Sequence, residues 1–597
     1  MCFCKFREVF TVSILLISTA CSEVSPCYDD RGNAISCREE VDMSPDQDMS
    51  ADMELVRDQG DEQEEACIPR TVEAVCASTC GVVSDGCDGM VQCEPCACEG
   101  GVPAQPVCGA CGLGRSVCDE DQEVTCVYPG DIPVDTFSCD QIVYVDPKEP
   151  MGGGTKEMPF NSYAAALQSF AADETGVIVM SEGVLNEPLV LKSGVHVMAG
   201  YQNDSTGWVR DDQAQVVFKP ASSPDENEDT FGMIATEIMR PTIVYGVQIE
   251  APDAPPEKTS YGAYIKDATF LTLDHVLIKA GRGGAGRPGQ DGADGADGGR
   301  GGAPHCMPDQ IPGLNAVHNK PLGGRGGENA QCPDANGGRG GYGATHNQAG
   351  AIKAHAGQNS ADGKAMGGVA GDLNNSTSTL NTGGDGENGP LVMSDIRHGE
   401  RGQASWNLEE DRWVNQGRGS SGTDGVHGSG GGGGGGAGDD RQWAWTVGGG
   451  GGGAGGCGGK HGQGGGTGGA SIGALVVRSN MTLENSTIQA QSGGKGGRGG
   501  VGGDGGQGGS GESGSFMACD FEPIMLKWRS GHGGRGSGGS NGGDGGGGAG
   551  GASFGVLCEE GALTSRSSEI SFNEGGQGGE SSHPGEDGPS TGLVNCE

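Results

Sequence analysis

The chain has 597 residues, of which 122 are glycine, and its formal net charge is −43 at pH 7. Only 34% of its residues are hydrophobic and 5% aromatic, so a single apolar core cannot extend through the whole chain. Proteins that bind nucleic acid neutralise phosphates with clustered Lys and Arg, so the acidic balance argues against a nucleic-acid partner.

Residues 1–20 have the pattern of an export signal. Lys5 and Arg7 precede an apolar run at residues 9–17, which is too short for a permanent membrane span. Small residues follow, and Cys21 comes directly after Ala20 in a pattern that resembles the lipobox of bacterial lipoproteins. The resemblance implies lipidation of Cys21 and an anchor in the outer membrane or at the cell surface. Plain secretion is the alternative.

Residues 21–66 are expected to form an acidic tether. The stretch from Glu39 to Glu65 contains repeated Asp-Met units, many acids and few apolar residues. Such a segment repels itself and cannot bury enough apolar surface to fold, so it predicts a disordered linker.

Residues 67–139 contain twelve cysteines. Their CxxC spacings would suggest zinc in a cytosolic chain, but in an exported chain they predict disulfides that substitute for a core. The segment CGVVSDGCDGMVQCEPC resembles small Cys-rich modules of Gram-negative surface lipoproteins. Outside the module, we expect Cys27 to pair with Cys37, and Cys306 with Cys332, because neither pair has another cysteine near it in sequence.

A short helix is predicted after residue 160. Tyr163, Leu167 and Phe170 mark one apolar face, and Asn161 or Ser162 is placed to cap the N-terminus. We expect this face to cover the end of the structure that follows.

Short β-rich runs follow at residues 177–180, 189–191 and 195–198. The order of a YVD strand, a Gly-Thr turn, a PF pair, an amphipathic helix and the runs GVIV, EPLVL and GVHVMAGY resembles the entry to pectin-lyase-like right-handed parallel β-helices. This resemblance, close over residues 143–210, implies a solenoid of stacked coils. It also implies two functional classes, non-catalytic surface proteins and enzymes that cleave polysaccharides.

An internal repeat supports a solenoid. SYGAYIKDATFLTLDHVLIKAGRGGAG begins at Ser260, SIGALVVRSNMTLENSTIQAQSGGKGG at Ser471, and SFGVLCEEGALTSRSSEISFNEGGQGG at Ser553. Each unit contains three strands and then enters glycine triplets. Such units bury their apolar residues only when stacked on one another.

Glycine recurs at every third position in residues 283–301, 493–514 and 533–551. Collagen would need abundant proline in the triplets, and only Pro288 occurs in the first run. We expect polyglycine II instead, a threefold extended helix whose bare edges let neighbours approach. A flexible glycine-rich linker is the alternative, because ordering glycine costs about 1–2 kcal/mol per residue.

The long insertion at residues 279–470 contains four tryptophans, which are either a local packing cluster or an exposed platform for sugar rings: Trp406, Trp413, Trp443 and Trp445. Catalytic candidates suggested by the β-helix resemblance are Asp267, Asp274, His275 and Lys279. The repeat argues against them, because the position of Asp274 becomes Glu484 and then Arg566 in the later units. No catalytic residue is therefore expected. No metal ligand is expected, because His318, His346 and His355 show no metal-ligand spacing, and no cofactor is expected.

The predicted fold is all-β, a right-handed parallel β-helix with polyglycine II-like insertions. The expected organisation is a signal peptide (1–20), a tether (21–66), a Cys-rich module (67–139), an N-terminal β-helix part (142–278), a glycine-rich lobe (279–470) and C-terminal coils (471–597). The expected role is structural or adhesive at the cell surface, with extracellular polysaccharide or another cell surface as partner. A polysaccharide lyase or glycoside hydrolase and an ice-binding protein are the alternatives.

Overall fold

The computed structural model describes residues 132–150, 152–204, 207–211, 213–222, 225–307, 321–347, 350–371, 381–393, 395–438, 446–514 and 528–596, with short segments between residues 27 and 130. The chain divides into two compact units, Met1–Ala66 and Cys67–Glu597. In the first unit, the described residues are an antiparallel pair of strands, β1 (Cys27–Tyr28) and β2 (Ala34–Ile35). All further description concerns the second unit.

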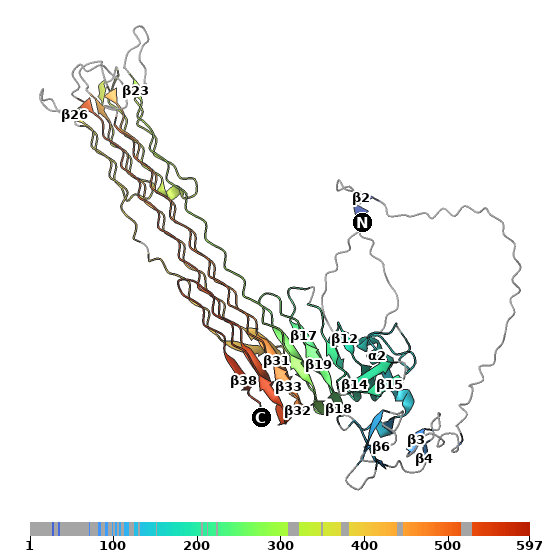
Figure 1. The fold of residues 1–597 in the computed structure, drawn as a ribbon. Helices are drawn as coiled ribbons and strands as arrows, with labels where there is room; N and C mark the ends of the chain where they lie inside the picture. The colour runs from blue at the N-terminus through green and yellow to red at the C-terminus, as the bar shows by residue number, and fades with distance from the viewer. Residues whose placement is uncertain are drawn as a thin grey trace, which may run out of the picture. The chain divides into compact units, whose positions relative to one another are not determined.

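Three parallel sheets organise the second unit (Figure 1). Sheet 1 contains β10 (Ile142–Val145), β11 (Gly176–Ser181), β14 (Val195–Asp204), β18 (Thr242–Tyr245), β21 (Leu271–Asp274), β32 (Asn480–Glu484) and β36 (Ala562–Arg566), with β15 (Gly207–Arg210) antiparallel on β14. Sheet 2 contains β12 (Gly183–Leu185), β16 (Val216–Phe218), β19 (Val247–Glu250), β22 (Leu277–Lys279), β33 (Thr487–Gln489) and β37 (Glu569–Ser571). Sheet 3 contains β13 (Leu189–Leu191), β17 (Thr230–Thr236), β20 (Ser260–Lys266), β31 (Ser471–Val477), β35 (Ser553–Glu559) and β38 (Ser590–Val594).

The internal repeat is in register in these sheets. Ser260 lies opposite Ser471 and Ser471 opposite Ser553, all in parallel pairs of sheet 3. The same pairing continues from β21 to β32 to β36 in sheet 1 and from β22 to β33 to β37 in sheet 2. The repeat and the all-β class are therefore confirmed.

The core consists of apolar side chains from all three sheets. Alternate residues of β16, β18 and β19 are buried, as the period of two in a strand requires, whereas β11 and β31 are buried along their whole length. Examples from sheet 1 are Val197, Leu273 and Leu483, from sheet 2 Phe218, Ile278 and Ile488, and from sheet 3 Met233, Ala474 and Val556. Short strands can stack this way because each one buries its apolar residues against the next.

Helix α2 (Tyr163–Ser169) packs against this core. The Ser162 side chain accepts a hydrogen bond from the backbone N–H of Ala165 at 3.1 Å, which confirms Ser162 as the N-cap. Tyr163 and Phe170 are buried in the core cluster, and Leu167 is partly buried against it. The Tyr163 hydroxyl donates to the carbonyl oxygen of Val190 at 3.0 Å, which ties the helix to sheet 3.

The outer face of sheet 1 is covered near the Cys-rich segment. Leu113, Ile132 and Val134 pack against Tyr144 and Tyr201. The described elements of this region are η3 (Val134–Thr136), η4 (Cys139–Gln141), β3 (Val82–Ser84), β4 (Met90–Gln92), β5 (Cys98–Glu99), β6 (Val102–Pro103), β7 (Val107–Cys108), β8 (Gly114–Cys118) and β9 (Val124–Val127).

Disulfides occur in both the Cys-rich and the glycine-rich regions. Cys108 pairs with Cys126, and Cys118 and Cys139 are also disulfide-bonded. Cys558 of β35 pairs with Cys596 after β38. For the predicted Cys27–Cys37 pair, Cys37 and the side chain of Cys27 lie outside the described residues.

The predicted Cys306–Cys332 pair is wrong. Cys332 pairs with Cys457, 125 residues away in sequence. The reason is lateral packing: the backbone N–H of Gly455 donates to the carbonyl oxygen of Ala335 at 2.7 Å, so Cys332 and Cys457 lie on neighbouring segments. Cys306 belongs to β23 (Cys306–Met307), which pairs with β30 (Thr446–Val447).

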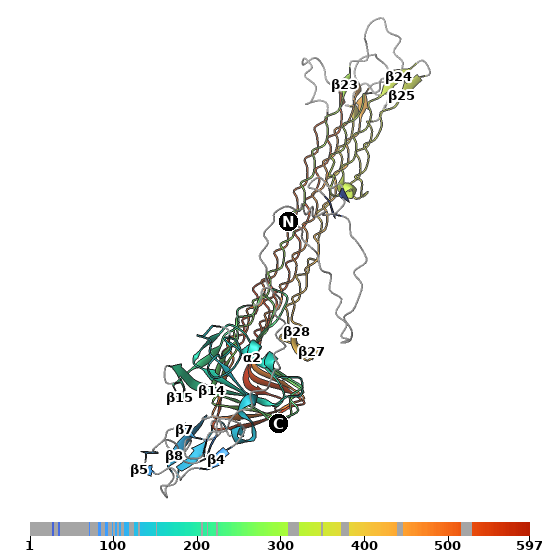
Figure 2. The ribbon, with the colours of Figure 1, turned by 90° about the vertical axis from the view of Figure 1, so that its right-hand side faces the viewer.

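Long glycine-rich segments leave the sheets and run side by side (Figures 1 and 2). The longest are residues 281–303, 381–393 with 395–403, 417–438, 446–470, 490–514 and 528–552. Backbone N–H groups of Gly286, Gly289 and Gly292 donate to carbonyl oxygens of Lys495, Arg498 and Val501, each at 2.7 Å. The spacing of three residues on both segments shows that they pack in a constant register. We call this assembly the glycine bundle.

Small elements occur within and beside the bundle. They are η5 (Pro333–Ala335), β24 (Thr345–Asn347), β25 (Gly350–Ile352), β26 (Asn381–Thr382), β27 (Trp406–Glu409), β28 (Arg412–Asn415), β29 (Ala437–Gly438) and β34 (Trp528–Arg529). Strands β23 and β26 lie at the end of the bundle that is remote from the sheets (Figure 1). Within the part of the chain that the structure describes, no helix has the length and hydrophobicity of a membrane span.

The most buried segment of the bundle is residues 446–470. It exchanges backbone hydrogen bonds with the segments 281–303, 417–438, 490–514 and 528–552. Its residues 448–459 are all buried, and only Ala454 and Cys457 among them carry side chains. A segment surrounded on all sides has no room for side chains, which explains why glycine here is continuous rather than one residue in three.

Candidate functional site

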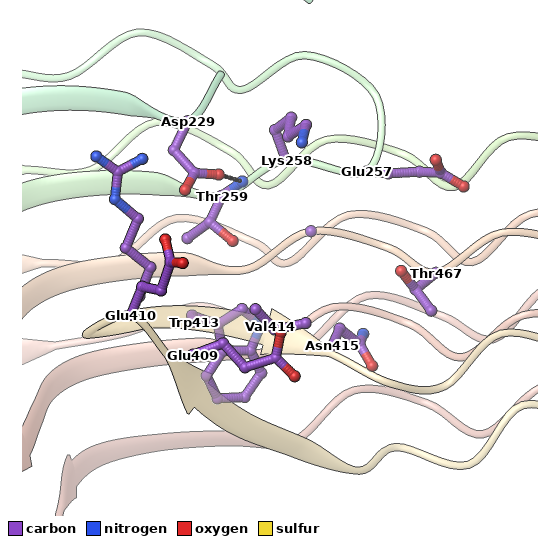
Figure 3. A pocket seen from close by; sticks show the side chains of 12 residues that line it. Asp229, Glu257, Lys258, Thr259, Glu409, Glu410, Trp413, Val414, Asn415 and Thr467 are labelled. Atoms are coloured by element: carbon purple, nitrogen blue, oxygen red, sulfur yellow. Dashed lines mark hydrogen bonds between the residues drawn. The ribbon is translucent and has the colours of Figure 1, made fainter. Parts of the chain in front are cut away.

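A cavity of about 450 Å³ lies where the glycine bundle joins sheet 3 (Figure 3). One wall contains Asp229 and residues 257–259, which precede strands β17 and β20. The second wall is the hairpin of β27 and β28, and the third contains Thr467 and Gly469 of the bundle. Figure 3 shows Asp229 on one wall, with Glu409 and Glu410 of the hairpin on another.

The hairpin turn has a conformation that fixes its acids. Glu410 and Asp411 both adopt positive φ angles, 52° and 63°, as the two central residues of a type I′ turn do. Asp411 forms ion pairs with Lys266 at 2.7 Å and Arg478 at 2.8 Å. These partners hold the pKa of the Asp411 carboxyl well below its usual range, with Arg478 the larger cause.

Trp413 anchors the hairpin to sheet 3. Its backbone N–H donates to the hydroxyl oxygen of Tyr261 at 2.9 Å. Its ring lies 4.6 Å from that of Trp406 and 5.3 Å from that of Phe554, between ring centroids. Trp413 is only 5% exposed, and its indole Nε1 has no hydrogen-bond partner among the described residues.

The environment of Asp229 differs from that of the other acids of the cavity. Its carboxylate accepts a hydrogen bond from the backbone N–H of Thr259 at 2.9 Å. Burial raises the pKa of Asp229, although this hydrogen bond and nearby Arg412 oppose the change. Glu409 and Glu410, in contrast, are exposed.

Two further contacts position the walls. The Asn415 side-chain amide donates to the carbonyl oxygens of Gly468 and Gly550, at 2.9 and 3.2 Å. Glu257 lies 3.7 Å from the guanidinium of Arg418, which follows the hairpin. The cavity therefore combines acceptors and donors from segments that are held in fixed positions.

The structure separates the four predicted tryptophans. Trp406 and Trp413 form the packing cluster, and the burial of Trp413 excludes it from an exposed sugar platform. Trp443 and Trp445 lie outside the described residues, as does Cys21. From Trp406 to Trp413 the sequence reads W-N-L-E-E-D-R-W, in which apolar and polar residues alternate on either side of a Glu-Asp turn. This pattern indicates a β-hairpin and is the sequence signal that could have located the site.

The catalytic candidates do not meet in this cavity. Asp274 lies beside Glu484 in sheet 1, and Glu484 lies beside Arg566. Asp274 contacts His275 at 2.7 Å and the Asn485 amide at 3.1 Å. The Glu484 carboxylate pairs with Arg566 at 3.0 Å.

The remaining two candidates are on other elements. Asp267 pairs with Arg478 at 2.9 Å, and Lys279 is the last residue of β22. The catalytic candidates therefore lie on separate elements, and the carboxylate of each of the two aspartates already has a partner of its own.

One group among the described residues has metal-ligand geometry. Ligand atoms of Cys332, His427 and Cys457 lie within 4.8 Å of one another. The two sulfurs are bonded as a disulfide, and His427 Nδ1 accepts a hydrogen bond from the backbone N–H of Gly458 at 2.9 Å. A disulfide supplies no thiolate ligand, and the lone pair of His427 Nδ1 is used in this hydrogen bond, so this group is not assigned as a metal site.

Comparisons of the chain with protein-family models, with curated proteins and with solved structures found no match.

Proposed function

We propose that the protein is a non-catalytic structural protein of the bacterial cell surface. In this proposal, a right-handed parallel β-helix of the pectin-lyase-like kind carries a polyglycine II bundle that acts as a rigid spacer. The lipid on Cys21 would hold the chain at the outer membrane, and residues 21–66 would separate the anchor from the folded part. The continuous hydrogen bonding of the glycine bundle is the observation that carries the proposal.

The turns between the sheets support a β-helix. Asp267, Arg478 and Glu560 follow β20, β31 and β35, and all three adopt positive φ angles between 46° and 51°. His275, Asn485 and Ser567 follow β21, β32 and β36 with angles between 47° and 53°. Equivalent left-handed residues at equivalent corners are what a chain needs to repeat one coil geometry.

The hydrogen bonds of residues 490–514 support polyglycine II, because neighbours surround this segment in three directions. The N–H groups of Gly497, Gly500 and Gly503 donate to the segment 446–470. Those of Gly493, Gly496 and Gly499 donate to residues 574–580. A helix of three residues per turn presents one residue in three to each neighbour.

Aspartates complete the third direction. The N–H groups of Val501, Asp504 and Gln507 donate to side-chain oxygens on the segment 281–303, namely those of Asp291, Asp294 and Asp297, at 2.7–2.8 Å. Side chains thus satisfy the backbone donors that no backbone carbonyl reaches. Since an unpaired N–H costs free energy, this arrangement favours one fixed register over a flexible linker.

A polysaccharide lyase or glycoside hydrolase is the second candidate, favoured by the adjacent Asp274 and Glu484. Both acids are already partnered, and neither lines the cavity beside the hairpin. The ice-binding alternative needs a flat, uncharged face. The described surface of the bundle instead carries ion pairs such as Arg498–Asp291 and Lys495–Glu580.

The spacer function can be tested by attaching the full chain to a flat support through its N-terminal region. A quartz crystal microbalance then measures energy dissipation per bound mass. A rigid spacer predicts low dissipation, and the Gly502→Val variant should raise it. Dissipation as high as that of a glycine-serine linker of equal length would contradict the proposal.

Surface location needs a separate test. When the chain is expressed in cells supplied with a labelled fatty acid, the chain should become labelled, and the Cys21→Ser variant should not. External protease should digest the chain on intact cells. Retention of an unlabelled chain inside the cell would contradict the location.

A further inference from the structure

We propose that the cavity between the hairpin and sheet 3 binds a neutral or amino sugar unit of a polysaccharide. The spacer function does not require this site, and the site does not depend on the spacer function. The inference rests on the donors and acceptors that line the cavity, on their net charge and on the way the hairpin is held.

The cavity presents both kinds of hydrogen-bonding group. The acceptors are the carboxylates of Asp229, Glu409 and Glu410, and a donor is the guanidinium of Arg412. A sugar hydroxyl both donates and accepts, so it can bridge such a carboxylate and such a donor. The volume of about 450 Å³ lies within the range of roughly 300–1,000 Å³ that is usual for small-molecule sites.

Trp413 lines the cavity and gives its wall a packed support. Its Nε1 is buried and is not accessible from the cavity, so it offers no hydrogen bond to a ligand there. One ring neighbour, Trp406, is stacked on it, and another, Phe554, meets it edge to face. The ring is therefore used in packing, and Trp413 contributes a rigid support for the hairpin rather than a stacking platform or a hydrogen-bond donor for the ligand.

The walls are fixed before any ligand arrives. Asp411 is held by Lys266 and Arg478, and the Asn415 amide is held by two backbone carbonyls of the bundle. A site whose polar groups are already ordered avoids the entropic cost of ordering them on binding. This favours a binding site for a specific ligand over a chance grouping of polar residues where the bundle joins sheet 3.

The charge of the cavity restricts the ligand. Four acids (Asp229, Glu257, Glu409 and Glu410) and two bases (Lys258 and Arg412) line it, which leaves a net charge of −2. This balance disfavours uronic acids and sulfated sugars. It also does not predict a metal ion, because among the described residues these carboxylates form no group of three ligand atoms within 4.8 Å.

Binding can be tested with the full chain on immobilised oligosaccharides. The panel contains neutral glucan oligomers, amino-sugar oligomers of the chitosan type, anionic oligogalacturonates and, as a different class, oligolysine. We expect binding to at least one of the neutral or amino sugars. The Asp229→Asn and Glu410→Gln variants should each weaken it about tenfold, equivalent to about 1.4 kcal/mol.

The Asp253→Asn variant is the matched control, because Asp253 is an exposed acid outside the cavity. It should bind as the parent does. If Asp229→Asn lowers the melting temperature, Glu410→Gln on the exposed turn decides the question. Any of three results would overturn the proposal: binding of oligolysine or oligogalacturonate alone, sugar binding that neither variant weakens, or no binding on the panel. None of these outcomes would change the dissipation expected of a rigid spacer.

Discussion

Residues 471–489 and 490–514 are consecutive in the chain, yet they pack by opposite means. The first stretch contributes one strand to each sheet and buries Val476, Leu483 and Ile488 against the equivalent side chains of its neighbours. The second has no apolar core and is held by backbone hydrogen bonds at every third residue. Apolar side chains thus stabilise the first stretch, whereas the second is stabilised by backbone hydrogen bonds that require side chains to be absent.

This difference predicts opposite sensitivities to mutation. In the sheets, removing side-chain volume should destabilise, because the hydrophobic core is close-packed. In the bundle, adding side-chain volume should destabilise, because segments approach until their backbones touch.

The largest effect is expected for Leu483→Ala in β32. Leu483 is fully buried in the core, so the variant should lose about 2–5 kcal/mol of unfolding free energy. Thr482→Ala on the same strand is the control and should change stability by no more than about 0.5 kcal/mol. Denaturant unfolding monitored by circular dichroism measures both. Equal effects of the two changes would show that Leu483 does not contribute to a packed core.

A smaller but clear effect is expected for Gly502→Val in the bundle. A Cβ atom at Gly502 would overlap the backbone carbonyl of Gly542, which cannot move as a flexible side chain would. Overpacking of this kind costs about 1–3 kcal/mol. Val501→Ala is the control, because Val501 is 52% exposed and should tolerate the change within about 0.5 kcal/mol.

Limited proteolysis across residues 490–552 compares these two variants. Faster cleavage of Gly502→Val alone fits a packed bundle. Equal cleavage of the parent and both variants would indicate a flexible linker.

The third effect is the smallest and depends on pH. The Asp291 carboxylate accepts from the Val501 N–H and lies beside Arg498, and these contacts lower its pKa, the hydrogen bond being the larger cause. A lowered folded-state pKa gives stability that is present above the unfolded value of about 3.9 and is lost as the pH falls through the folded value. Acidification below about pH 4 should therefore loosen this contact.

The Asp291→Asn variant separates this contact from other acids. An Asn side chain can still accept from Val501 but does not titrate, so the variant should lose less melting temperature than the parent between pH 5 and pH 2.5. Calorimetry at both pH values measures the difference. An identical loss in parent and variant would show that Asp291 does not contribute to the pH dependence.

Much of the fold could be predicted because its signals are local or periodic. The repeats at Ser260, Ser471 and Ser553 lie in register as their sequences indicate. The helix N-cap at Ser162 could also be predicted, because capping depends only on residues within one turn. The period of the repeat and contacts between residues close in sequence were sufficient to predict these elements.

The site and one disulfide could not be predicted, because they depend on which segments become neighbours. Trp413 contacts Tyr261, which is 152 residues away, and Cys332 pairs with Cys457 across 125 residues. Sequence proximity wrongly favoured Cys306 as the partner of Cys332. Triplet periodicity shows that segments pack laterally, but it does not specify the order in which they are arranged.

The order of the glycine bundle can be measured by amide hydrogen exchange across residues 493–514, followed by mass spectrometry on the full chain. The N–H groups of Gly497, Gly500 and Gly503 donate to the most buried segment, each at 2.8 Å, so their exchange should remain protected well beyond minutes. Immediate exchange throughout residues 493–514 would contradict the account.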